Sequence, residues 1–206
     1  MRRVIAYIDG FNLYFGLKES GWKRYYWLDL WRLTERLIQD DQQLAQLHYF
    51  TARISGARGN SADAARQTTY LDALQTISGI SIHEGHYLTK PRECRRCGNR
   101  WPEPEEKMTD VNIAVRLLVD AFDDGFDTAI LISADSDLVP PVREIRERLP
   151  EKRIVAAMPP RRHSRDLANL AHASFQIGEQ KIRKSQLPDH IQTESGFILQ
   201  RPATWK

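Results

Sequence analysis

The chain has 206 residues, of which 41% are hydrophobic and 28% are charged, so it is long and apolar enough to fold around a buried core. This composition excludes an intrinsically disordered, collagen-like or low-complexity protein. The 30 Lys and Arg side chains against 27 Asp and Glu give a net charge of +3, which is too small to indicate a nucleic-acid partner by itself.

The sequence contains no membrane or export signal that we recognise. Its longest apolar runs, such as 129–132, are far shorter than the roughly 20 residues of a membrane span. The N-terminus leads directly into a strand-like stretch, without the apolar region and cleavage site of a signal peptide. We therefore expect a cytoplasmic protein without a membrane partner. Its two cysteines, Cys94 and Cys97, should then be reduced thiols or metal ligands rather than a disulfide.

Apolar strands alternate with amphipathic helices along the chain. The first strand, 3–8, ends at Asp9-Gly10. The pattern then predicts, in order, a helix over 11–19, a helix over 30–39, a strand over 44–54, a helix over 61–77, a strand over 80–88, a polar insert with both cysteines over 90–104, a helix over 109–122, a strand over 128–132, a helix over 140–149, a strand over 153–157, a helix over 164–171 and a strand over 175–177.

Repeated strand–helix units predict an α/β fold with three layers, in which a doubly wound, mostly parallel sheet lies between two layers of helices. We expect one domain over 1–183, which includes the small Cys-bearing insert. Residues 184–206 should form a C-terminal extension that lies over this domain.

Several acidic residues stand where such a sheet would bring them together. Asp9 follows the first strand, and Asp135 and Asp137 follow a short, fully apolar strand. Asp110 opens a helix at the inward edge of its first turn, and Asn12 stands three residues after Asp9. Ligands of open α/β sheets bind where the strands end. Carboxylates held this close repel one another unless a cation lies between them, and oxygen ligands suit Mg²⁺ or Mn²⁺.

A helix cap is the alternative for each of these acids taken singly. An Asp after a strand often caps the following helix, and Asp137 fits that role because Leu138-Val139-Pro140 follows it. Two strand ends together with an inward-facing helix acid make the metal site the better interpretation.

Three blocks of the sequence resemble the NYN domain, a branch of the PIN-like ribonuclease fold. They are IDGFNL at 8–13, EKMTDVNIA at 106–114 and ISADSDL at 132–138, and the stretch from Ser164 to Phe175 resembles the closing helix and strand of that family. The resemblance covers about residues 3–178. It implies a metal-dependent ribonuclease with a carboxylate set of Asp9, Asp110, Asp135 and Asp137. Ala134 stands where Gly is common in the family.

The expected chemistry assigns a role to each residue of the set. Hydrolysis of a phosphodiester needs a nucleophile made from water and neutralisation of the charge on the phosphoryl oxygens, and carboxylate-bound Mg²⁺ or Mn²⁺ supplies both. We expect Asp9 as the central ligand, Asp135 as the second, Asp110 as a ligand or water-orienting base, Asn12 as the group that orients a carboxylate or contacts the phosphate, and Ser133 behind them. No GxxxxGK[ST] loop is present in the sequence, so ATPase chemistry is not expected.

The sequence CRRCG at 94–98 is half of a zinc-knuckle pattern, because two thiolates at this spacing can share one zinc ion. Two further ligands are needed. His83 and His86 stand just before the insert, although strand alternation puts them on opposite faces, so that one of them at most reaches the metal. A cysteine pair from a second chain in a homodimer is one alternative, and a loop with two free thiols is the other.

Two basic clusters accompany these motifs: Arg95 and Arg96 in the insert, and Arg161 and Arg162 before a later helix. On the rim of the acidic site they would hold the backbone of single-stranded or structured RNA. The sequence therefore predicts a Mg²⁺- or Mn²⁺-dependent endoribonuclease. An RNA-binding or scaffolding module with little catalysis is the first alternative, and a phosphotransfer enzyme that uses the 135/137 acid pair is the second.

Overall fold

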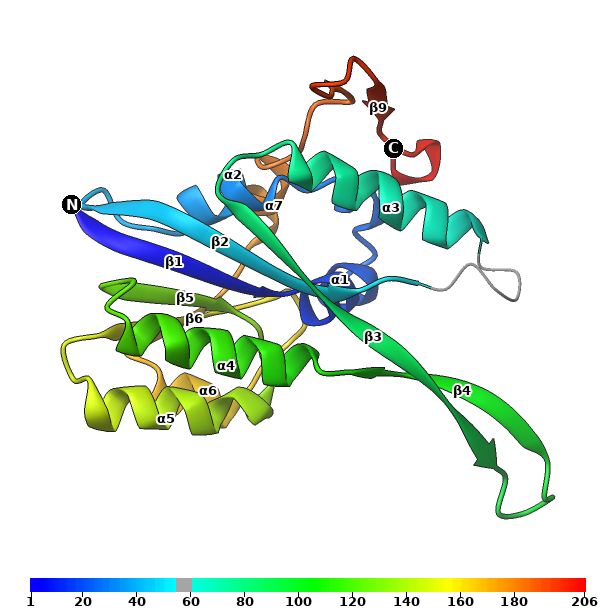
Figure 1. The fold of residues 1–206 in the computed structure, drawn as a ribbon, viewed down its shortest axis with the longest axis horizontal. Coiled ribbons are helices and arrows are strands. Elements are labelled where there is room, and N and C mark those ends of the chain that lie inside the picture. The colour runs from blue at the N-terminus through cyan, green and yellow to red at the C-terminus, as the bar shows by residue number, and fades with distance from the viewer. Residues whose placement is uncertain (55–60) are drawn as a thin grey trace.

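The structure, a computed structural model, describes residues 1–54 and 61–206, without the side chains of 86–90 and 102–107. Its centre is a seven-stranded sheet in the order β4-β3-β2-β1-β5-β6-β7 (Figure 1). Every neighbouring pair is parallel except β3 and β4. The strands are β1 (Arg2–Asp9), β2 (Gln42–Ala52), β3 (Ile80–Glu93), β4 (Arg100–Lys107), β5 (Thr128–Ile132), β6 (Arg153–Met158) and β7 (Ala173–Gln176).

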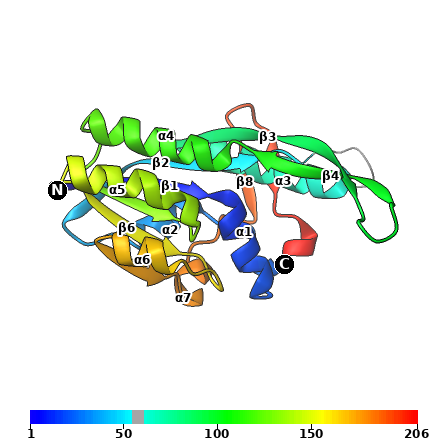
Figure 2. The same ribbon diagram turned by 90° about the horizontal axis from the view of Figure 1, so that it is seen from below.

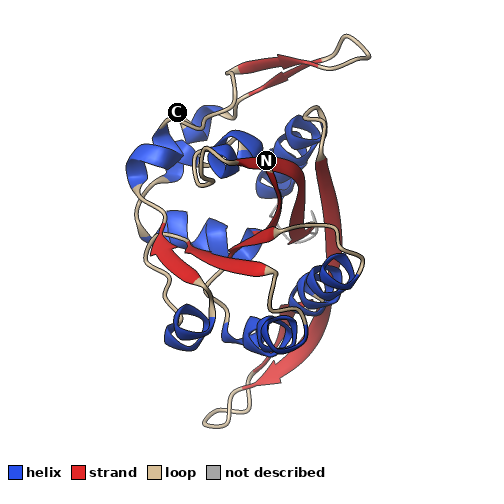
Figure 3. Ribbon diagram, turned by 90° about the vertical axis from the view of Figure 1, so that its left-hand side faces the viewer, coloured by secondary structure: helices blue, strands red, loops and turns tan. Residues whose placement is uncertain are grey.

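Helices cover both faces of this sheet (Figures 2 and 3). They are α1 (Gly10–Glu19), α2 (Leu30–Glu35), α3 (Ser61–Gln75), α4 (Thr109–Phe122), α5 (Val139–Arg148), α6 (Arg165–Leu170) and α7 (Glu179–Arg183). Side chains of β1 alternate between two cores. Val4 and Ile8 pack with α1, α2 and α3, whereas Ile5 and Tyr7 pack with α4, α5 and α6. The predicted three-layer, doubly wound α/β fold is therefore confirmed. No helix in the described part of the chain has the length and apolar character needed to cross a membrane.

The polar insert is the largest difference from the predicted elements. β3 continues beyond residue 88 to Glu93 and pairs with β4 as an antiparallel hairpin, in which His86 lies opposite Lys107. This hairpin, residues 86–107, extends away from the body of the protein (Figures 1 and 2), and we call it the arm. Two of its three prolines, Pro91 and Pro102, lie opposite each other, and its charged residues interrupt the apolar alternation. The pattern of side chains therefore did not predict β4 or the end of β3.

The C-terminal residues pack over α3 and the α1–α2 connection. They form a small antiparallel sheet, β8 (His190–Gln192) and β9 (Ile198–Gln200), and a final 3₁₀ turn. The Trp205 ring lies 5.7 Å from that of Tyr26 and 6.1 Å from that of Tyr70 (centroid distances). The Trp27 indole N–H donates a hydrogen bond to the carbonyl of Pro188 (2.8 Å). Tyr26, Tyr70 and Trp205 close one side of a cavity that has many aromatic side chains in its lining.

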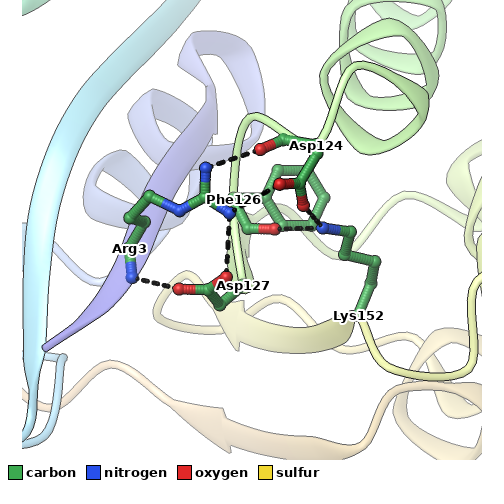
Figure 4. Close-up of polar contacts among 5 residues, drawn as sticks. All are labelled: Arg3, Asp124, Phe126, Asp127 and Lys152. Carbon is green, nitrogen blue, oxygen red and sulfur yellow. Dashed lines mark hydrogen bonds and ion pairs between the residues drawn. The ribbon is translucent and has the colours of Figure 1, made fainter.

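An ion-pair network holds β5 beside β1 at the edge of the sheet where the parallel strands begin (Figure 4). The Arg3 amide donates to Asp127 (2.6 Å), and the Arg3 guanidinium contacts Asp124 and Asp127. The buried Lys152 donates to the carbonyl of Phe126 (2.9 Å) and pairs with Asp124. Hydrogen bonds from Arg3 lower the pKa of Asp127. The network supports a register in which Val4 lies beside Thr128 and Ile8 beside Ile132, so both strands end at the same level.

Candidate metal centre

Three carboxylates converge at the carboxyl edge of the sheet, where its parallel strands end. One ligand oxygen each from Asp9, Asp110 and Asp135 lies within 4.8 Å of the others. Asp9 is 3% exposed, whereas Asp110 and Asp135 are half-buried. We call these three residues the carboxylate cluster. Asp137 is exposed and lies outside the cluster, which differs from the four-acid set that the family resemblance implied.

Local capping geometry places two of these acids. Asp9 ends β1 and caps α1, because its Oδ1 accepts a hydrogen bond from the Asn12 amide (2.9 Å). Asp135 caps the 3₁₀ turn after β5 in the same way, with the Asp137 amide as donor (2.9 Å). Asp110 lies in the first turn of α4. Asp9 and Asp135 are therefore helix caps, as the alternative predicted, and both also belong to the carboxylate cluster.

Ser133 and Asn12 connect the ends of β1 and β5. The Ser133 hydroxyl donates to Oδ2 of Asp9 (2.9 Å), and its oxygen accepts from the Asp135 amide (3.0 Å). The side-chain carbonyl of Asn12 accepts from the Ala134 amide (3.2 Å). Asn12 thus positions the β5 end and Asp9 together.

The electrostatics of the cluster favour a bound cation. Burial raises the pKa of Asp9, and the negative charge of Asp135 adds to this effect. Hydrogen bonds from Asn12 and Ser133 act in the opposite direction and favour the charged form. All three ligand groups are carboxylates, so the donor set fits a hard divalent ion such as Mg²⁺ or Mn²⁺.

A buried polar network that the sequence pattern did not predict lies between the sheet and α4. His48 Nδ1 and His83 Nε2 are 2.9 Å apart, and His48 Nε2 lies 3.3 Å from Oδ2 of Asp120. Asp120 also accepts from the Tyr7 hydroxyl (2.8 Å) and from Arg116 (2.6 and 3.0 Å). Burial lowers the pKa of His48 to about 4. A charged residue three positions after the inward Leu117 was the signal that could have revealed the network.

The cysteines lie at the tip of the arm, and His83 does not reach them because it is engaged with His48. The side chain of His86 lies outside the described residues. Its backbone pairs with Lys107, seven residues along the hairpin from the last pair, Glu93–Arg100. Seven residues of strand span about 23 Å, so the backbone places His86 far from the cysteines of the same chain.

The predicted basic clusters occupy different places. Arg161 is exposed and Arg162 half-buried just after β6, at the carboxyl edge that also carries the carboxylate cluster. Arg162 pairs with Glu19 of α1. Arg95 and Arg96 are exposed at the tip of the arm instead, about 23 Å beyond its first residue pair, so they are not on the rim of the cluster.

A cavity of about 610 Å³ lies beside Gly10, the neighbour of Asp9, and was not predicted. Burial raises the pKa of Tyr49, which lines it, to about 12. A side chain at Gly10 would collide with the Phe50 carbonyl at 2.6 Å and the Tyr49 hydroxyl at 2.8 Å, so only glycine fits there. The rings that line the cavity belong to Phe11, Tyr14, Phe15, Tyr26, Tyr49, Tyr70 and Trp205.

Three comparisons place this geometry among known proteins. A 6-hydroxy-3-succinoylpyridine 3-monooxygenase from Pseudomonas putida is 28% identical over 241 aligned positions, which cover 98% of this chain and 75% of that protein. The crystal structure of a protein of unknown function from Vibrio parahaemolyticus is 19% identical and has the same fold, with a TM-score of 0.57, covering 90% of this chain and 96% of the other. The model of the NYN domain matches residues 3–178. The match spans most of the chain and includes the whole carboxylate cluster, and the chain therefore belongs to the NYN domain family.

Proposed function

We propose that this protein is a Mg²⁺- or Mn²⁺-dependent endoribonuclease that hydrolyses phosphodiester bonds of RNA. The observation that carries the proposal is the convergence of Asp9, Asp110 and Asp135 within 4.8 Å at the carboxyl edge of an NYN domain. These three carboxylates would hold a divalent ion, which would supply activation of a water molecule and neutralisation of the charge on the phosphoryl oxygens.

The proposed roles of the cluster residues follow from how deeply each side chain is buried. Asp9 is buried and held by Ser133 and the Asn12 amide, so its carboxylate is oriented before any ligand arrives. Asp110 and Asp135 are half-buried, which leaves them accessible to a substrate phosphate and a water molecule. The exposed Arg161 at the same edge of the sheet supplies positive charge for the RNA backbone.

A cleavage assay with matched variants tests this function. Wild-type protein should cut a mixed RNA pool with Mn²⁺ or Mg²⁺ and stop when EDTA is added. Asp135→Asn should lose cleavage but bind RNA as well as the wild type or better, because a charge that repels phosphate is removed. Asp137→Asn is the control, since this exposed carboxylate lies outside the cluster, and it should keep most of the activity. Tight RNA binding without any cleavage by the wild type would favour the scaffolding alternative.

The aromatic cavity favours a second candidate, which is binding of a small planar molecule. The relative from Pseudomonas putida is named for its action on a substituted pyridine, and the tyrosine and tryptophan rings of the cavity would stack on such a ring. Titration of the wild type with 6-hydroxy-3-succinoylpyridine, followed by tryptophan fluorescence and melting temperature, tests it. Saturable binding that Tyr14→Ala weakens, together with no RNA cleavage, would favour this candidate over the ribonuclease.

A further inference from the structure

The turn at the tip of the arm has the backbone arrangement of half a zinc site. The Cys94 amide donates to the Asn99 carbonyl (2.8 Å), and the Gly98 amide donates to the Cys94 carbonyl (2.8 Å). Gly98 has a φ of +68°, which favours glycine. Hydrogen bonding from the backbone of Arg96 and from the backbone and side chain of Cys97 lowers the pKa of the Cys94 thiol. Both sulfurs therefore lie side by side, as two ligands of one tetrahedral ion must.

Within the part of one chain whose side chains the structure describes, this site has two ligands. Structural zinc takes four, and the chain has no cysteine besides Cys94 and Cys97. Among the residues whose side chains the structure describes, no His, Asp or Glu joins the pair to form a group of three. His83 is held by His48, and the backbone of His86 lies about 23 Å down the hairpin.

The position of Cys94 and Cys97 at the tip of the arm makes them accessible to a second chain. It extends beyond the helices that surround the sheet (Figures 1 and 2), and Cys97 is exposed at its tip. Arg95 and Arg96 are exposed beside the sulfurs. A zinc ion with four thiolates carries a net charge of −2, and the four guanidinium groups of two tips would offset it.

We propose that Cys94 and Cys97 of two chains bind one Zn²⁺ between them, so that two arms are joined tip to tip in a homodimer. On binding, four thiols release four protons and form four Zn–S bonds, and no electron is transferred. This inference is independent of the proposed ribonuclease function, because it rests on the arm alone.

The stoichiometry of zinc tests the proposal directly. Protein made with ample zinc and kept in a non-thiol reductant should contain 0.5 zinc per chain and elute as a dimer in light scattering. A zinc chelator should convert it to monomer without unfolding, and Co²⁺ in place of zinc should give the intense visible absorption of a tetrahedral tetrathiolate. Cys94→Ser and Cys97→Ser should each lose both metal and dimer, with an unchanged circular dichroism spectrum. His86→Ala is the control and should keep both.

Three outcomes would overturn the proposal. One zinc per chain in a monomer would mean that ligands within the chain complete the site. Absence of zinc from reduced protein would leave two loop thiols. A dimer that persists in the double Cys94→Ser, Cys97→Ser variant would use another surface, such as the exposed apolar side chains of α4, which are Val111, Val115, Val119 and Phe122.

Discussion

The Ser133 hydroxyl donates a hydrogen bond of 2.9 Å to Oδ2 of Asp9, although 124 positions separate the two residues in the sequence. The bond joins the ends of β5 and β1 and restricts rotation of the Asp9 carboxylate. Ser133→Ala should therefore weaken Mn²⁺ binding and cleavage by about 10- to 100-fold while the fold is kept. Isothermal titration with Mn²⁺ measures the loss. The exposed Ser136, at the start of the 3₁₀ turn after β5, gives the control, Ser136→Ala, and equal affinities of the two variants would contradict the role of Ser133.

Asp9→Asn separates stability from metal binding. Burial raises the pKa of Asp9, so its charged form costs folding free energy, and this cost grows as pH rises above the ordinary carboxylate pKa. In EDTA at pH 7 the variant should melt at the same temperature as the wild type or higher. With Mn²⁺ at about 100 times the dissociation constant, the wild type should gain about 2.7 kcal/mol and the variant nothing. A variant that Mn²⁺ stabilises as much as the wild type would show that Asp9 is not a ligand.

Gly10→Ala tests the close packing behind the cluster. The added methyl group would meet the Phe50 carbonyl at 2.6 Å and the Tyr49 hydroxyl at 2.8 Å, so α1 must shift. We expect a loss of about 1–3 kcal/mol in the free energy of unfolding, measured with urea, and weaker metal binding because Asp9 precedes the shifted residue. Gly178→Ala is the matched control, because φ is −80° there and nothing lies within 4 Å of the added carbon.

The His48 network should make the protein sensitive to mild acid. Burial lowers the pKa of His48 to about 4, below the value of 6.5 for a free imidazole, so the unfolded chain binds this proton more readily. Stability is then fully present above pH 6.5 and falls as pH decreases toward 4, by up to about 3 kcal/mol. Urea unfolding at pH 7 and 4.5 measures the fall. His48→Gln should show a smaller fall than the wild type, and an equal fall would assign the effect to other groups.

Arg161 should contribute to RNA affinity more than its neighbour does. Arg161 is exposed at the carboxyl edge of the sheet, whereas the guanidinium of Arg162 pairs with Glu19. Arg161→Ala should weaken binding evenly across sequences and lower the salt slope by about one, and Arg162→Ala should do less. Filter binding at several salt concentrations checks this, with Arg148→Ala on α5 as the control. Equal slopes for all three variants would exclude Arg161 from the interface.

Local patterns determined most of the elements and pointed to all three acids of the carboxylate cluster. The helix 109–122 and the strand 128–132 have the bounds that their periodicity predicted, because each buries one continuous apolar stripe or run. Asp9 and Asp135 could be placed at one edge because parallel strands end together. The position after the strand 128–132 and the resemblance to the NYN domain both included Asp137 in the predicted set, and the structure leaves that residue outside the cluster.

Only the tertiary structure decided which of these side chains meet others far away in the chain. The arm exists because backbone groups of β3 pair with those of β4 across a sequence of prolines and charges, which no side-chain period reveals. His83 contacts His48 rather than the cysteines because the parallel register of β2 and β3 places the two histidines side by side. The sequence by itself therefore determined most of the elements and the residue types of the candidate site, whereas backbone pairing, strand register and packing decided the arm and the partners of each polar group.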